Sequence, residues 1–349
     1  DRLVATGFIR PSVLWRGLQR CRPSFSHWGV GLLIGLSGLL VEPLAWLQSL
    51  LYAQRLRRVQ LPDDPIVIIG HWRSGTTYLH QLLACDPAVA TARNTLTMAP
   101  QVALLLQPWI APLMKVWMTR VRPIDAVPWG PDDPQEDELG LARLTFDTNM
   151  GGMAFPRDYL ANFRRHVLET STAYERQWLT FCRLTWLHDG AGKSHWLIKN
   201  SVHTARVRLV LKHFPRARFV LLRRSPVDSI RSLVQVKQRL GALVGLQPLP
   251  DPPTQVEETA TAHRELLEAF EASRHLIPAQ QLLELDYDDL ISQPLQAVEG
   301  IYTHFDLTSW PVAEAPIKAR IDRARSYTAD PVQLPPLAER RLQELMKAS

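Results

Sequence analysis

Cysteine is scarce in this sequence of 349 residues, which contains three: Cys21, Cys85 and Cys182. No two of them have the spacing of a metal-ligand or redox pair, so we expect reduced, buried thiols in a cytosol-like compartment. Clusters of Cys and His with the spacing of zinc ligands are also missing, and no metal ion is predicted. The sequence shows no internal repeat, and its composition excludes disordered, collagen-like and disulfide-scaffold proteins.

The N-terminal region lacks a hydrophobic run of membrane-spanning length. Residues 28–41 form an uncharged stretch of fourteen residues, fewer than the ~20 that cross a bilayer. Glu42-Pro43 then interrupts the apolar pattern, which resumes as far as Tyr52. Two interpretations remain open: an arginine-flanked anchor that contacts a membrane peripherally through residues 28–53, or a helical hairpin packed on the main domain. We predict an N-terminal helical segment, residues 1–60, followed by one domain, residues 61–349.

The charge balance is basic but does not identify a partner by itself. Forty Lys and Arg residues against 34 Asp and Glu residues give a net charge of +6. This favours anionic partners such as phosphorylated cofactors, nucleic acid or an acidic membrane face. Basic residues are not interleaved with aromatic residues as in proteins that bind single strands, so no nucleic-acid partner is predicted. We expect a cytoplasmic protein that is either free or peripheral to the membrane.

Four short apolar runs alternate with helical patterns from residue 61 onward. The run 66–69 is uninterrupted, as expected of a strand buried on both faces, and further strands are predicted at 196–198, 218–222 and 282–285. Amphipathic patterns predict helices between them. Such alternation is typical of a three-layer α/β/α fold with a central parallel sheet.

The loop that follows the first strand has the form of a phosphate-binding loop. Gly70 and Gly75 form a G-x-x-x-x-G frame before a predicted helix, so that backbone N–H groups and the helix N-terminus are available to an anion. The position of the Lys that contacts the triphosphate in a Walker loop is Thr76, and the cation, Arg73, lies inside the loop. This favours an anion without a γ-phosphate, and counts against the alternative of a nucleotide-triphosphate-dependent kinase or NTPase.

A second candidate anion site follows the strand 218–222. Arg224 leaves this strand, and Ser232 follows eight residues later, about two turns along the predicted helix. A guanidinium and a hydroxyl in this arrangement suit a phosphate group. The alternative is an ordinary strand-to-helix connection with surface arginines.

Together these motifs resemble those of the P-loop-like sulfotransferases that use 3′-phosphoadenosine 5′-phosphosulfate (PAPS), in particular their bacterial branch. The stretch Lys199-Asn-Ser-Val-His203 also matches a family element. The resemblance implies a sulfotransferase with PAPS as co-substrate, no required metal, and a hydroxyl or amine acceptor on a small molecule, lipid or glycan. It further implies that the 5′ end is bound by Arg73, Ser74, Gly75, Thr76 and Thr77, and the 3′-phosphate by Arg224 and Ser232.

In-line transfer of a sulfuryl group requires charge neutralisation and a general base. We expect Arg73 at the leaving oxygen and Lys199 at the sulfuryl oxygens. His203 is the first candidate for the base because its unperturbed pKa of ~6.5 suits neutral pH, although it equally fits a packing histidine. Glu136 or Glu138 is the second candidate, although this acidic stretch is also typical of a solvated helix start.

Two interpretations outside this mechanism remain open. The apolar stretch 96–117 either lines a pocket for a hydrophobic acceptor or belongs to the core. The arginine-flanked N-terminal segment and the positive charge also fit a non-catalytic, membrane-associated binding protein.

Overall fold

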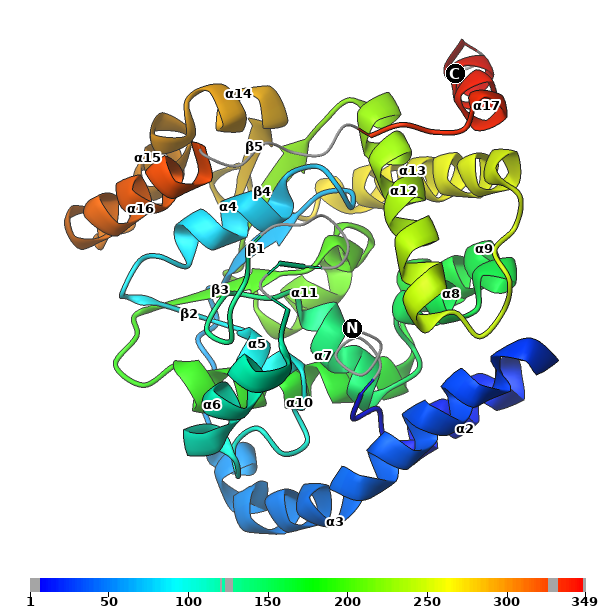
Figure 1. Ribbon diagram of the computed structural model, residues 1–349. Coiled ribbons are helices and arrows are strands. Elements are labelled where there is room, and N and C mark those ends of the chain that lie inside the picture. Colours follow the sequence, from blue (N-terminus) through cyan, green and yellow to red (C-terminus); the bar gives the residue numbers. More distant parts are fainter. Residues whose placement is uncertain (1–6, 120, 123–127, 326–331, 348–349) are drawn as a thin grey trace.

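The computed structural model describes residues 7–119, 121–122, 128–325 and 332–347. A five-stranded parallel sheet forms its centre, in the order β2-β3-β1-β4-β5 (Figure 1). Four of these strands are predicted from the sequence, and the three-residue edge strand β2 is missed. The strands are β1 (Ile66–Ile69), β2 (Val89–Thr91), β3 (His195–Lys199), β4 (Arg218–Arg223) and β5 (Leu282–Asp286).

The register of the sheet brings the carboxyl ends of the strands to one edge. Ile68 of β1 pairs with Lys199 of β3 on one side and with Val220 of β4 on the other. The chain order reverses at β1, because β2 and β3 lie on one side of it and β4 and β5 on the other. Parallel sheets bind ligands outside the carboxyl ends of the strands at such a point. The loop after β1 occupies that position.

Alternate residues of β1 face two separate apolar layers. Ile66 and Ile68 pack with α4, α15 and α16, whereas Val67 and Ile69 pack with α10, α11 and α13. Helices therefore cover both faces of the sheet (Figure 1), and the predicted α/β/α architecture is confirmed. These helices are α4 (Thr76–Leu83), α10 (Thr172–Asp189), α11 (Val207–His213), α13 (Pro252–Arg274), α15 (Pro294–His304) and α16 (Trp310–Arg325).

The remaining helices surround this core. Several are short and lie in the long excursion between β2 and β3, which also contains the acidic stretch considered below. They are α5 (Asn94–Thr97), α6 (Gln107–Trp117), α7 (Asp137–Leu144), α8 (Met150–Ala154) and α9 (Tyr159–Phe163). The other α-helices of the described residues are α2 (Pro11–Arg20), α3 (Trp28–Arg58), α12 (Pro226–Val244), α14 (Tyr287–Ser292) and α17 (Pro336–Lys347).

The N-terminal segment is helical, as predicted, but its helices break at a different place. The helix α3 runs through Pro43 without interruption for 31 residues, and the turn lies before it, between α2 and α3. One face of α3 is attached to the main domain: Gln48 Nε2 donates to the carbonyl of Pro100 at 2.9 Å, and Tyr52 Oη donates to that of Leu104 at 3.0 Å. The domain boundary at residue 60 stays a prediction.

Within the described residues, one helix, Phe25–Arg58, is long and apolar enough to cross a membrane by length and composition. The stretch 96–117 contributes mainly to the core, where Leu96, Val102, Ile110 and Met114 are buried. The described residues of this stretch therefore favour the core interpretation over a pocket for an acceptor.

Candidate active site

The loop after β1 has a backbone that only a few residues adopt easily. Gly70, Arg73 and Gly75 have φ angles of 136°, 69° and 94°. A Cβ atom at Gly70 would lie 2.5 Å from the carbonyl oxygen of Leu222, so glycine is required for the close approach of β4. A positive φ at a non-glycine residue such as Arg73 costs about 1–3 kcal/mol and is concentrated at functional sites.

Side chains hold this loop in place from both ends. Ser74 Oγ donates to the carbonyl of His71 at 2.7 Å, and the N–H of Gly70 donates to Thr204 Oγ1 at 2.8 Å. Ser74 is buried and serves the loop itself in this conformation. Thr204 was not among the sequence candidates, because nothing in its sequence neighbourhood indicates a bond to a loop 134 residues away.

The N-terminus of α4 presents unpaired backbone donors next to the loop. Within the described part of the chain, no backbone carbonyl accepts a hydrogen bond from the N–H groups of Gly75, Thr76 or Thr77. These groups and the helix dipole make a favourable environment for an anion. Thr76 is buried and Thr77 is half-buried.

The two candidate anion sites are joined by direct hydrogen bonds. Arg73 Nε donates to Ser232 Oγ at 2.9 Å, and Arg224 Nη1 donates to the carbonyl oxygen of Arg73 at 2.7 Å. The Arg224 guanidinium also lies 4.1 Å from the centre of the Tyr287 ring. Sequence reasoning missed Tyr287, although it follows β5 at the same sheet edge where Arg224 follows β4, which is the signal that was available.

The acidic stretch before α7 folds against the end of β3. Lys199 Nζ lies 2.5 Å from Glu136 Oε2, and the N–H of Ser201 donates to Glu136 Oε1 at 3.1 Å. Glu138 accepts from Asn200 Nδ2 at 3.0 Å and from the N–H of Asn149 at 2.6 Å. The structure thereby brings Glu136 and Lys199 together at the sheet edge that carries the loop.

This helix start is not solvated, which corrects the alternative interpretation of the acidic stretch. Asp137 and Glu138 are both buried. Burial, followed by the neighbouring Glu136 and Glu138 charges, raises the pKa of Asp137 well above its usual value. Burial also raises the pKa of Glu138, while the Arg206 guanidinium and the Asn200 amide oppose this shift. Glu136, next to these two buried carboxylates, keeps 16% of its side chain exposed.

The profile of the family described as "Sulfotransferase family" matches residues 65–311. This chain belongs to the sulfotransferase family. It is also 25% identical, over 311 residues, to the omega-hydroxy-beta-dihydromenaquinone-9 sulfotransferase Stf3 of Mycobacterium bovis and to that of Mycobacterium tuberculosis. Each alignment covers 87% of this chain and 77% of the relative. Membership of this family disfavours the kinase or NTPase and the non-catalytic binding protein.

Two solved structures share the fold of this sulfotransferase. Sulfotransferase STF9 of Mycobacterium avium superposes with a TM-score of 0.66 at 17% identity, over 98% of this chain and 95% of that chain. Sulfotransferase STF1 of Mycobacterium tuberculosis gives a TM-score of 0.61 at 20% identity, over 95% and 90%. The central parallel sheet and its P-loop-like connection are therefore features of this fold.

His203, the first candidate for the base, is enclosed in the sulfotransferase interior. Its side chain is fully buried, and its ring meets the Trp178 ring at an angle of 62° with 5.0 Å between centres. Burial, aided by the Arg206 charge, lowers the pKa of His203 to about 3. Neither ring nitrogen has a hydrogen-bond partner among the described residues. This value lies far below the unperturbed pKa of ~6.5 on which the choice of His203 as base depended, and the surroundings fit the packing alternative.

Among the described residues of the sulfotransferase, no three His, Cys, Asp or Glu side chains gather in an arrangement that could hold a metal ion. The three cysteines are free thiols, and burial raises the pKa of each. These thiols are therefore poor nucleophiles at neutral pH.

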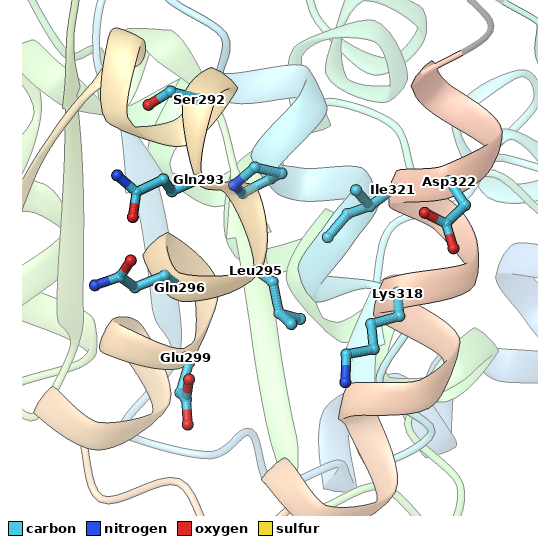
Figure 2. Close-up of a pocket in the computed structure, with 9 residues that line it drawn as sticks. Ser292, Gln293, Leu295, Gln296, Glu299, Lys318, Ile321 and Asp322 are labelled. Atoms are coloured by element: carbon cyan, nitrogen blue, oxygen red, sulfur yellow. The ribbon is translucent and has the colours of Figure 1, made fainter.

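An open groove of about 700 Å³ lies between α15 and α16, away from the residues considered above. Figure 2 shows Gln296 and Glu299 on one side and Lys318 and Asp322 on the other. Lys318 pairs with Glu314 of its own helix at 2.7 Å. The lining has both charge signs and includes none of the predicted site residues, so the groove lies apart from the candidate active site.

Proposed function

We propose that this sulfotransferase transfers the sulfuryl group of PAPS to a hydroxyl group on a hydrophobic acceptor. The observation that carries the proposal is the direct connection between the two candidate anion sites, from Arg73 to Ser232 and from Arg224 to Arg73. PAPS carries negative charge on both sides of its ribose, on a 5′-phosphosulfate and on a 3′-phosphate. Two connected sites, each with an arginine and hydroxyls, fit that arrangement without a divalent ion.

The residues of the two candidate anion sites suit different ends of the nucleotide. The N–H groups of Gly75, Thr76 and Thr77 lie at the N-terminus of α4 and suit the 5′-phosphosulfate. Arg224 and Ser232 suit the 3′-phosphate, and the Tyr287 ring supports the Arg224 guanidinium from one side. Ser74 contributes by holding the loop through its bond to His71.

The transfer itself needs three functions from this chain. Arg73 neutralises the charge that develops on the bridging oxygen as adenosine 3′,5′-bisphosphate leaves. Lys199 stabilises the equatorial sulfuryl oxygens. The oxygen of the acceptor hydroxyl bonds to sulfur while the S–O bond to the nucleotide breaks, and Glu136 accepts the proton of that hydroxyl.

Glu136 is preferred over the other two candidates for the base on burial and hydrogen bonding. His203 is fully buried with a pKa of about 3, so it has no exposed nitrogen for an acceptor. Both carboxylate oxygens of Glu138 accept hydrogen bonds from buried groups. Glu136 is partly exposed, and its ion pair with Lys199 orients it.

The proposed acceptor class is a lipid alcohol. The mycobacterial relative is named for a hydroxylated menaquinone derivative, and we extend that class to this chain, with other small-molecule or glycan hydroxyls and amines as alternatives. We further propose that the protein acts in the cytoplasm, free or at the membrane surface.

Thermal unfolding in the presence of nucleotides tests the co-substrate. We expect adenosine 3′,5′-bisphosphate to raise Tm in EDTA, since a ligand at 100 times its Kd stabilises by about 2.7 kcal/mol. Stabilisation by Mg-ATP alone would contradict the proposal. Incubation with ³⁵S-labelled PAPS and separate lipid, phenol and carbohydrate fractions then tests the acceptor class, and label in the carbohydrate fraction alone would overturn the lipid assignment.

A further inference from the structure

The N-terminal helix α3 exposes an unusually large apolar surface. Trp28, Leu32, Leu36, Leu40, Trp46 and Leu50, here called the outer face, are all more than half exposed, and Leu40 and Trp46 reach 80% and 72%. At 100° per residue these positions lie within an arc of about 120°. Contiguous exposed apolar surface on this scale marks an interaction site.

The outer face carries no charge, because the one charged residue between positions 28 and 54 points elsewhere. That residue is Glu42, and it pairs with Arg10 at the start of α2. The opposite side of α3 is attached to the body through Gln48, whose Oε1 accepts from the N–H groups of Leu104 and Leu105 at 2.8 and 3.1 Å. The attachment fixes which side of α3 faces outward.

A second set of exposed apolar side chains lies on α6. This helix begins two residues after Leu105, which is bonded to α3. Trp109, Leu113 and Val116 lie on one side of α6 and are exposed, whereas Ile110 and Met114 on the other side are buried in the core. Figure 1 shows α6 beside α3 at the same end of the molecule. Two helices thus present apolar side chains to the outside.

Cationic residues border this surface at both ends. Arg22 precedes α3, and Arg55, Arg57 and Arg58 close it, all with exposed side chains. Exposed tryptophans and flanking arginines are typical of helices that lie in a membrane interface. We propose that the outer face of α3, together with α6, docks the enzyme on an anionic phospholipid surface, with α3 lying in the membrane plane.

The charge distribution favours lipid over the other occupants of such a face. Both ends of α3 are cationic, so a second copy of the chain would place arginines beside arginines in either alignment, whereas anionic headgroups complement both ends. Crossing the bilayer would require α3 to leave the body and to carry Glu42 and Gln48 into hydrocarbon. The proposal does not depend on the co-substrate or the acceptor, although a lipid acceptor would be present at that surface.

Vesicle sedimentation of the full chain tests the proposal. We expect at least tenfold stronger partitioning onto phosphatidylglycerol-containing vesicles than onto phosphatidylcholine vesicles, and weaker partitioning at high salt. Leu36→Glu combined with Leu40→Glu should reduce partitioning at least tenfold. The matched control, Ile291→Glu with Val312→Glu, changes two exposed apolar residues on other helices and should reduce it less than twofold.

Two further measurements test whether the double variants are folded and whether tryptophans of the enzyme contact lipid. Circular-dichroism melts should show equal folding of both double variants, because all four positions are solvent-exposed. Brominated lipids should quench the fluorescence of the unmodified enzyme, and Trp46→Phe should lose part of that quenching. Four outcomes would each overturn the proposal. The unmodified enzyme does not bind vesicles, or the Leu36/Leu40 double variant binds them equally well. Alternatively, the unmodified enzyme is a dimer that binds no vesicles and the double variant is a monomer, or the enzyme stays in membranes after alkaline carbonate washing.

Discussion

Lys199 Nζ and Glu136 Oε2 are 2.5 Å apart, although 63 residues separate them in the chain. The lysine is almost fully buried and the glutamate is 16% exposed. Removing one partner of such a pair leaves the other charge with poor solvation, which is costly. The pair therefore fixes the orientation of both groups at the sheet edge where the phosphate-binding loop begins.

Replacing the proposed base tests the reaction chemistry. Glu136→Gln keeps the size of the side chain but removes the proton acceptor, so we expect kcat to fall about 10²- to 10⁴-fold. The affinity for adenosine 3′,5′-bisphosphate, measured by calorimetry, should change little.

Glu138→Gln is the matched control for that change. Its carboxylate accepts two buried hydrogen bonds, so we expect the variant to lose stability and to keep kcat within a few-fold. Full activity of Glu136→Gln, together with an inactive but folded His203→Asn, would return the role of base to His203.

Replacing Arg224 tests which end of the nucleotide this residue binds. Arg224→Ala should weaken binding of adenosine 3′,5′-bisphosphate about 10- to 100-fold, since it removes charge-assisted hydrogen bonds to the 3′-phosphate. Binding of 5′-AMP, which has no 3′-phosphate, should weaken less than threefold. Arg223→Ala is the control, because the neighbouring Arg223 pairs with Glu284 and Glu271 instead. Equal losses for both nucleotides would contradict the assignment.

Glycine at position 75 is required for two reasons that a pair of variants can separate. A Cβ there would lie 2.6 Å from Tyr287 Cδ2, at a φ of 94°. Gly192 has a φ of 73° and open space around it, so Gly192→Ala reports the backbone strain alone, about 1–2 kcal/mol. In urea unfolding we expect Gly75→Ala to lose more free energy than Gly192→Ala, and to lose nucleotide binding. Equal losses would mean that the Tyr287 ring moves aside.

His203 makes the stability of the protein sensitive to acid. Its pKa is about 3 in the folded state, because burial disfavours the charged ring, against ~6.5 in the unfolded chain. Between these two pKa values the unfolded state binds a proton that the folded state does not, and the free energy of unfolding falls by up to about 1.4 kcal/mol for each pH unit of acidification. The buried His263, with a pKa of about 4, acts in the same direction.

His203→Asn removes one of the two side chains that bind a proton when the protein unfolds in acid. Urea unfolding between pH 7 and pH 5 should show a shallower loss of stability with acid than in the unmodified enzyme, whatever the change in stability at pH 7. Unchanged slopes would show that His203 titrates normally in the folded state.

The sequence alone predicted four of the five strands and both candidate anion sites. The run 66–69, the glycines of the loop and the spacing from Arg224 to Ser232 depend on neighbouring residues, and local patterns encode local structure. The edge strand β2 was missed because three residues carry too little pattern. The uninterrupted course of α3 through Pro43 was missed because packing of one face on the body outweighed the helix-breaking tendency of proline.

Only the tertiary structure decided which groups meet and which are enclosed. Burial separated Glu136 from Glu138 and His203, the three candidates for the base that the sequence left open, because solvation depends on what the rest of the chain places around a side chain. The contacts of Arg73 with Ser232 and of Arg224 with Tyr287 likewise join residues from separate strand ends. Which strand ends lie next to each other in a parallel sheet depends on the order of the strands. This order cannot be predicted from any single segment of the sequence.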